Sequence, residues 1–265
     1  MVRILDIGLD DVIDFFEGAG GNLREMVLGE HTHVGGILES EILALKAGIA
    51  ESSVVLDVAC GIGGPARFLG RRYGCKVVGL DASPATIRQA EARSAAEGIE
   101  DKVIFRVGDA LHMPFTDHTF SVVWGQDAWC YVLDKEQLIA EIARVLKPHG
   151  RVAFTDWVET DKINDDERMQ LNEFMTIPYL ESCDGYVQLL KQAGFSVEEA
   201  ETLDERFTEY VGKYATTVSN VLRDIIIKRY SESVFERLNE GVQRWLIAAQ
   251  ARKVTQCRIV ASLMG

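Results

Sequence analysis

The chain has 265 residues, of which 47% are hydrophobic and 26% are charged, and this composition suits one large globular domain. Its formal net charge is −13, so the surface repels phosphate backbones and anionic membranes, and we expect neither nucleic acid nor a membrane as a partner. No apolar run approaches the roughly 20 residues of a membrane span, and the five scattered cysteines show no metal-binding spacing. With no signal-peptide pattern at its start, the sequence predicts a reduced, cytoplasmic protein without a metal site.

The first fifty residues are expected to form a helical segment ahead of the core. Residues 10–17 have the pattern of a short amphipathic helix, which the glycines of residues 18–21 should break. Ser40 can cap a further helix that runs to Ala47. Between these helices, the polar, glycine-flanked stretch 29–36 holds two of the five histidines. This stretch is either a solvated turn or a lid over a ligand.

A glycine-rich turn between a strand and a helix follows. The apolar run 54–56 predicts a buried strand, and a helix is expected to begin just after Pro65. The intervening Gly61, Gly63 and Gly64 let the backbone approach a ligand closely and direct helix N-terminal N–H groups at it. The spacing also fits the dinucleotide-binding pattern, so this turn alone does not decide between ligands.

Two acidic residues make the ligand interpretation more specific. Asp57 lies inside the strand–turn stretch, where a purely structural strand rarely carries a charge, and it could hold a ligand's ammonium group. Asp81 ends the next apolar run, where a carboxylate can accept hydrogen bonds from ribose hydroxyls. Either residue alone could be a turn cap or a solvated charge, but together they favour a nucleoside-containing ligand.

Strands and helices alternate from residue 53 to residue 158, which predicts a parallel sheet that is covered on both faces. Strands are expected near residues 53–58, 76–80, 102–106, 120–125 and 151–157, and helices near 65–73, 84–97 and 134–146. Ligands bind at the carboxyl ends of such strands. The residues Asp57, Asp81, Asp109 and Gln126 all fall at those ends.

The pattern changes after Trp157. Residues 159–180 are polar at first, and a helix near 182–193 and a strand near 195–201 then resume the core. Residues 203–250 look helical, and the last strand is expected at 253–263. The predicted division is therefore a helical cap or lid at 1–50, a ligand-binding core at 51–202, a helical cap insertion at 203–251 and a last core strand at 252–265.

Several motifs in register resemble the class I S-adenosylmethionine-dependent methyltransferases. They are DVACGIGG (57–64), Asp81, GDALHMPF (108–115), FSVVWGQDAW (120–129) and IARVLKPHGRVAFTDW (142–157). The resemblance implies an α/β fold, a Rossmann-like, doubly wound, seven-stranded sheet with an antiparallel last strand. It also implies that the N-terminal segment closes the site, which favours the lid interpretation of residues 29–36.

The same resemblance implies S-adenosyl-L-methionine as cofactor and a set of residues that bind it. Asp57 would hold the ammonium group, Asp81 the ribose and Asp109 the exocyclic amine of adenine. The implied cofactor-binding residues are Asp57, Ala59, Gly61, Gly63, Asp81, Ala82, Asp109, Ala110 and Gln126. No metal is implied, because displacement at a sulfonium needs no Lewis acid.

The stretches CGIGGPAR, VVWGQDA and GEHTHVGG look most like the sarcosine/dimethylglycine N-methyltransferases, which implies a small amine acceptor. Those enzymes usually carry a histidine where this chain has Tyr131, so we expect Tyr131 to orient the acceptor and His33 to be the candidate general base. Aromatic walls that favour a cationic product would come from Trp129, Trp157 and Tyr179.

Other functions remain open at this point. The stretch GGPAR also resembles sterol and tocopherol methyltransferases, so the acceptor could be an isoprenoid, quinone-like or other secondary metabolite that is methylated on carbon or oxygen. The glycine pattern also allows a nicotinamide-dependent oxidoreductase, and a non-catalytic cofactor-binding module is the third alternative. The expected partner is a small-molecule methyl acceptor, with a homodimer possible.

Overall fold

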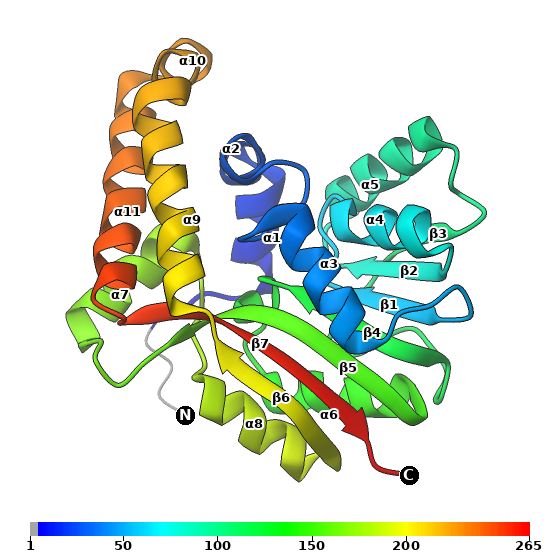
Figure 1. The fold of residues 1–265 in the computed structure, drawn as a ribbon. Helices are drawn as coiled ribbons and strands as arrows, with labels where there is room; N and C mark the ends of the chain where they lie inside the picture. The colour runs from blue at the N-terminus through cyan, green and yellow to red at the C-terminus, as the bar shows by residue number, and fades with distance from the viewer. Residues whose placement is uncertain (1–4) are drawn as a thin grey trace.

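The computed structural model describes residues 5–265 of the chain. Its strands form one sheet in the order β3-β2-β1-β4-β5-β7-β6 (Figure 1). The strands are β1 (Val54–Val58), β2 (Lys76–Asp81), β3 (Val103–Val107), β4 (Phe120–Gln126), β5 (Leu146–Glu159), β6 (Phe195–Thr202) and β7 (Val254–Leu263). Strands β1 to β5 run parallel, and β7 lies antiparallel between β5 and β6. The predicted sheet with an antiparallel last strand is therefore confirmed.

Helices connect the strands, and several extend beyond the carboxyl ends of the parallel strands (Figure 1). They are α1 (Leu9–Glu17), α2 (Ala19–Leu28), α3 (Gly36–Ala47), α4 (Gly64–Tyr73), α5 (Pro84–Glu97), α6 (Lys135–Val145), α7 (Asp165–Met175), α8 (Cys183–Gln192), α9 (Asp204–Thr217), α10 (Arg223–Arg229) and α11 (Glu232–Gln250). A 3₁₀ turn at Trp129–Tyr131 follows β4, and a π-helical turn at Val218–Leu222 joins α9 to α10. No helix in the described part of the chain has the length and hydropathy of a membrane span.

Both faces of the sheet are buried, as a parallel sheet with crossover helices requires. Successive side chains of a strand point to opposite faces, so Val55 and Leu56 of β1 belong to two different cores. Leu56 packs in the core that α6 and α8 cover, whereas Val55 packs in the core beneath α3, α4 and α5. This double burial explains why the strands appear in the sequence as apolar runs without alternation.

The N-terminal helices differ from the prediction. The glycines of residues 18–21 do not break the helical segment as a block, because only Gly18 separates α1 from α2. Gly20 and Gly21 lie inside α2, where a Cβ atom would come within 2.4 Å of the Phe15 ring and 2.1 Å of the Phe16 carbonyl oxygen respectively. These two glycines therefore allow α2 to pack closely against α1.

Helix α3 also begins earlier than expected. It starts at Gly36, so Ser40 lies inside the helix rather than at its N-cap. Residues 165–175, for which the sequence analysis predicted no element, form α7. Asn164 and Glu167 form a capping box there, in which each side chain accepts a hydrogen bond from the other residue's backbone N–H.

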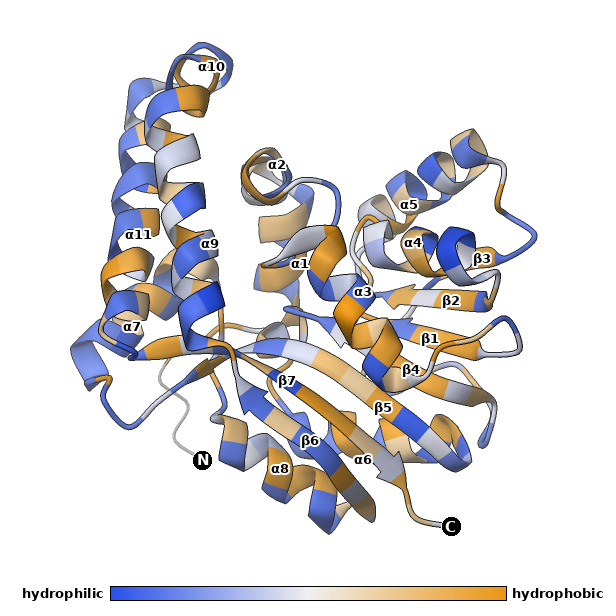
Figure 2. Ribbon diagram, viewed as in Figure 1, coloured by the Kyte–Doolittle hydropathy of each residue, from blue (hydrophilic) through white to orange (hydrophobic). Residues whose placement is uncertain are grey.

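Helices α9 and α11 rise as an upright pair beside α2, with α10 at their upper end (Figure 1). Hydrophilic and hydrophobic bands alternate along α9 and α11 (Figure 2). This pattern is typical of helices that each bury one apolar stripe and expose the opposite face. This segment occupies the place of the predicted insertion between β6 and β7. The division of the chain into a lid, a core and a cap stays a prediction.

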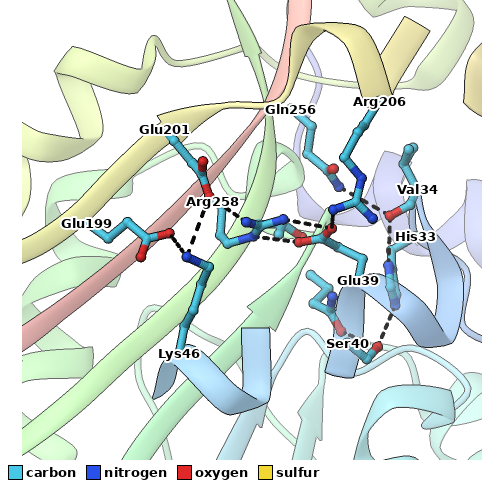
Figure 3. A network of polar contacts seen from close by, with 12 residues as sticks. His33, Val34, Glu39, Ser40, Lys46, Glu199, Glu201, Arg206, Gln256 and Arg258 are labelled. Atoms are coloured by element: carbon cyan, nitrogen blue, oxygen red, sulfur yellow. Dashed lines mark hydrogen bonds and ion pairs between the residues drawn. The ribbon is translucent and has the colours of Figure 1, made fainter. Parts of the chain in front are cut away.

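A buried ion pair joins α3 to β7 (Figure 3). The Nε and Nη2 atoms of Arg258 donate hydrogen bonds to the Glu39 carboxylate over 2.7 and 2.9 Å. Both side chains are buried: Arg258 is 4% exposed and Glu39 is 2% exposed. Arg258 also pairs with Glu201 on β6, and Arg206 of α9 lies 3.4 Å from Glu39. The network therefore fixes α3, which supports the cavity described below, against the sheet.

Replacing Glu39 with Ala should lower the free energy of unfolding by about 3 kcal/mol, because it leaves the buried Arg258 with Glu201 alone. The matched control is Lys213→Ala, which breaks an exposed pair with Glu209 and should change stability little. Urea unfolding of the two variants measures the difference, and equal stability losses would contradict a structural role for the Glu39–Arg258 pair.

Candidate active site

A cavity of about 350 Å³ opens at the carboxyl ends of β1, β2 and β4. Its walls contain nearly all of the residues that the sequence predicts for cofactor binding: Asp57, Ala59, Gly61, Asp81, Ala82, Asp109, Ala110 and Gln126. Helices α1 and α2 and the loop 29–35 form its opposite wall, through residues such as Val12, Phe16 and His31. The convergence of strand ends thus creates one enclosed site from residues that are far apart in the sequence.

Left-handed backbone conformations shape the turn after β1. Ala59, Gly61 and Gly63 have φ angles of 59°, 54° and 74°. Gly63, the one predicted cofactor residue that does not line the cavity, caps α4 and packs against Phe105, whose ring would lie 2.5 Å from an added Cβ atom. Gly63 is therefore required for backbone conformation and packing, while its neighbours form the cavity wall.

Asp57 places an unpaired carboxylate oxygen in the cavity wall. The side chain is 2% exposed, and its Oδ2 atom has no hydrogen-bond partner among residues 5–265. Burial, with a further contribution from the nearby Asp81 carboxylate, raises the pKa of Asp57 well above its ordinary value. A buried acceptor of this kind is costly without a partner, so the geometry fits a ligand cation such as an ammonium group.

Asp81 is held in a fixed orientation beside it. One carboxylate oxygen accepts the Gly61 N–H over 2.9 Å, and the other accepts the Ser83 N–H over the same distance. Burial raises the pKa of Asp81, although these two hydrogen bonds oppose the shift. The remaining lone pairs of both oxygens are positioned for neutral donors such as the hydroxyls of a ribose.

Asp109 and Gln126 complete the predicted cofactor contacts. The Asp109 carboxylate accepts the Leu111 N–H over 2.8 Å, which orders the loop after β3. The Gln126 Oε1 atom accepts the Ser40 hydroxyl over 2.8 Å, whereas its Nε2 atom is buried without a partner in the described part of the chain. The orphaned polar atoms of Asp57 and Gln126 both belong to this one cavity, and together with the glycine turn they fit S-adenosylmethionine.

Arg24 of α2 lines the far end of the same cavity, and the sequence analysis did not identify it. Its Nε atom donates to the Thr32 carbonyl over 3.1 Å, one terminal nitrogen donates to the Tyr131 hydroxyl over 2.9 Å, and the other donates to the Asp127 carbonyl over 3.3 Å. The guanidinium also lies 5.3 Å from the ring centre of Trp157. Arg24 thus ties α2 to the end of β4.

Arg24 has no direct ion pair with any of the residues 5–265, although its charge attracts the buried Asp127 carboxylate nearby. The side chain is 8% exposed, and within residues 5–265 no carboxylate lies within 4.0 Å of its guanidinium. Its three protein acceptors are neutral oxygens, which leaves two of its five N–H donors for a ligand. Buried guanidinium groups usually have an anionic partner, so this end of the cavity is suited to an anion.

Tyr131 and His33, the two predicted catalytic residues, are placed differently. Tyr131 lines the cavity, as expected, and burial raises the pKa of its hydroxyl. His33 does not line the cavity: it is fully buried, with Nε2 3.0 Å from the Ser40 hydroxyl and Nδ1 3.1 Å from the Val34 carbonyl (Figure 3). Helix α3 begins early enough to bring Ser40 against the loop, and this contact holds the His33 ring outside the cavity.

His31 is the histidine that lines the cavity. Burial, and then the neighbouring His33, lower the pKa of His31 to about 4, and burial also lowers the pKa of His33 to about 4. Both imidazoles are therefore neutral at pH 7 and are weak bases. The placement of His33 gives no support to its predicted role as general base.

The structure does not bring the three predicted aromatic residues together in this cavity. Trp129 is 1% exposed, donates its indole N–H to the Val58 carbonyl and lies in the core against Phe154. Tyr179 does not line the cavity, and the Lys135 ammonium lies 3.9 Å from its ring centre. Trp157 lines a separate, neighbouring cavity. The aromatic side chains that do line the cofactor cavity are Phe16 and Tyr131.

Comparisons with known proteins agree with this site. A family model described as a methyltransferase domain matches residues 56–154. The sterol 24-C-methyltransferase of Kluyveromyces lactis is 33% identical over 75% of this chain and 56% of that enzyme. Methyltransferase GfsG of Streptomyces halstedii is 31% identical over 74% of this chain and 76% of that protein.

Amine methyltransferases are similar as well. The glycine/sarcosine/dimethylglycine N-methyltransferase of Actinopolyspora halophila is 30% identical over 78% of this chain, which spans 36% of that enzyme. The solved phosphoethanolamine N-methyltransferase 2 of Haemonchus contortus, with phosphomonomethylethanolamine and S-adenosylhomocysteine bound, has a TM-score of 0.88 at 22% identity. That match covers 98% of this chain and 61% of the other, and it shows a shared fold.

The fold, the cavity and these relatives together identify the class of protein. The chain belongs to the methyltransferase domain family, because it covers most of the length of GfsG at more than 30% identity. It is an S-adenosylmethionine-dependent methyltransferase domain rather than a nicotinamide-dependent oxidoreductase. The chain spans about half the length of the sterol enzyme, and the relatives differ in the acceptors that their names give.

Asp57→Asn should weaken S-adenosylmethionine binding by about 1–3 kcal/mol and at the same time stabilise the ligand-free protein at pH 8. Because the folded-state pKa of Asp57 is raised, its contribution to stability is fully present below its unfolded pKa of about 3.9 and is lost as the pH rises through the folded value. The stability advantage of the Asn variant should therefore shrink toward pH 4.

Calorimetry of cofactor binding and urea unfolding at pH 8 and pH 4.5 measure these two effects. A variant that binds the cofactor normally, or that is less stable than the wild type at pH 8, would argue against an unpaired Asp57 carboxylate as the ammonium site.

Proposed function

We propose that the enzyme methylates the nitrogen of a small amine that also carries an anionic group. The smallest acceptors of this kind are glycine, sarcosine and dimethylglycine, which the sequence motifs favour. The observation that carries the proposal is the buried guanidinium of Arg24, which lines the cavity and has no ion pair with any of the residues 5–265. An amino acid would place its carboxylate against this charge and its amine toward the cofactor.

The arrangement of charge supports this orientation. Asp57 and Asp81 lie at the end of the cavity formed by β1 and β2, whereas Arg24 lies with Tyr131 beyond β4. A zwitterionic acceptor whose carboxylate binds Arg24 therefore directs its nitrogen away from the guanidinium. An acceptor with a positive charge and no anion would instead be repelled by the buried guanidinium.

The chain contributes orientation and exclusion of water. The cofactor, when bound, supplies the methyl group on a positively charged sulfur. Tyr131, held by the hydrogen bond from Arg24, presents its ring and hydroxyl to the acceptor, and Phe16 packs edge-on against that ring with the centroids 5.0 Å apart. Positioning of this kind can supply most of the rate enhancement of a displacement reaction, so no protein base is required if the amine binds unprotonated.

A second acceptor class is favoured by a different observation. A largely apolar cavity of about 330 Å³ adjoins the cofactor cavity, and it could accommodate an isoprenoid, quinone-like or other secondary-metabolite acceptor. Methylation would then occur on carbon or oxygen, which is the chemistry in the names of the sterol 24-C-methyltransferase relatives. An acceptor screen with labelled S-adenosylmethionine and mass spectrometry distinguishes the two classes by the atom that gains the label.

Replacing Arg24 with Gln should raise the KM for an amino-acid acceptor by at least tenfold, which corresponds to about 1.4 kcal/mol, because the carboxylate loses its charged partner. The Kd for S-adenosylmethionine should stay within twofold, because Arg24 lies at the acceptor end. Arg244→Gln, which changes a half-exposed arginine of α11, is the matched control and should leave both constants unchanged.

Steady-state kinetics with sarcosine and with the methyl ester of sarcosine test this point. The ester should be a poor substrate of the wild type and should be insensitive to Arg24→Gln. Equal KM values for sarcosine in the wild type and the Arg24 variant would contradict the proposed carboxylate site. The absence of nucleic-acid and membrane partners, the cytoplasmic location and the homodimer stay predictions.

A further inference from the structure

A second cavity, of about 330 Å³, lies between the N-terminal helices and the helical pair α9–α11. Its walls are formed by apolar side chains of α1, α2, α7, α9 and α11, among them Phe15, Leu23, Phe174, Leu238 and Val242. These elements lie together beyond the carboxyl ends of the parallel strands (Figure 1). A volume of this size is within the range of cavities that bind small molecules, and far exceeds an ordinary packing void.

Arg24 is a wall residue of both cavities. In the first cavity, the guanidinium of Arg24 lies beside Tyr131, to whose hydroxyl it donates a hydrogen bond. In the second cavity, the same guanidinium lies beside Trp157, with its central carbon 5.3 Å from the centre of the Trp157 ring. The two cavities therefore meet at a buried cation that has no ion pair within 4.0 Å among the described residues. A ligand with a negative group at this junction could extend into either cavity.

The composition of the second cavity restricts what would occupy it. Its charged lining residues are Arg24 and Arg237, and both are cationic. The indole N–H of Trp245, another lining residue that is 3% exposed, has no hydrogen-bond partner among residues 5–265. An apolar molecule with an anionic, oxygen-bearing end satisfies these features, whereas a cationic amphiphile does not.

We propose that the second cavity binds the apolar body of the methyl acceptor, which is an amphipathic anion whose negative group pairs with Arg24. The reacting atom then lies in the cofactor cavity and the apolar body lies against α9 and α11. This inference rests on the proposed function and makes it more specific. An α-amino acid with a long apolar side chain has the required shape, because its amine, carboxylate and side chain diverge from one carbon atom.

Decanoate serves as the binding probe, since it carries the anion and the apolar chain without a group that can be methylated. Calorimetry in the presence of S-adenosylhomocysteine should show decanoate binding at least tenfold more tightly than acetate or decylammonium. Leu238→Trp, which fills the second cavity, should weaken decanoate binding at least tenfold and leave the Kd for S-adenosylmethionine within twofold. Ile225→Trp, at a half-exposed position of α10 outside the cavity, is the control and should bind decanoate normally.

Two results would overturn the inference: decanoate affinity that is unchanged by Leu238→Trp, or decylammonium affinity equal to that of decanoate. Val242→Phe, a smaller substitution in the same wall, repeats the test if the Trp variant does not fold. A comparison of sarcosine with 2-aminodecanoate as acceptors separates this inference from the proposed function. Methylation of sarcosine alone would reject the apolar body, whereas decanoate binding without methylation of either amine would reject the amine acceptor.

Discussion

The site depends on two acidic side chains that end adjacent parallel strands and are buried together. The Asp81 carboxylate lies near enough to Asp57 to raise its pKa, and burial raises the pKa of both side chains. Asp81 is satisfied by two backbone N–H groups, but one oxygen of Asp57 has no partner in the described chain. The ligand-free protein therefore carries an electrostatic cost at this point, and a cationic cofactor removes it.

The acceptor side is organised by a second polar network, in which α3 has the central place (Figure 3). Ser40 binds Gln126 at the end of β4, while the preceding Glu39 is anchored to Arg258 of β7. Asp127, next to Gln126, accepts hydrogen bonds from the Val34 N–H and from Gln256. Changes in the position of α3 or the loop before it would thus be transmitted to the residues that line both ends of the cofactor cavity.

The sequence was sufficient to predict the sheet and most of the cofactor site, because both depend on local patterns. Apolar runs that end in Asp57, Asp81 and Gln126 determine which residues gather at one edge of a parallel sheet. The acceptor side depends instead on contacts between distant segments: Arg24 reaches Tyr131 over more than one hundred positions. The glycines of 18–21 suggested a break and so concealed α2, and nothing in the spacing of His31 and His33 indicated which of them would face the cavity.

The most direct test of this account is the number of protons exchanged when the cofactor binds. Because a bound cation lowers the raised pKa of Asp57, S-adenosylmethionine binding should release protons from the wild type within a series measured from about pH 5 to about pH 8. Calorimetry in two buffers of different ionisation enthalpy measures this release, and Asp57→Asn should remove it. Identical proton exchange in the wild type and the variant would contradict the claim that the site is built around an unpaired Asp57.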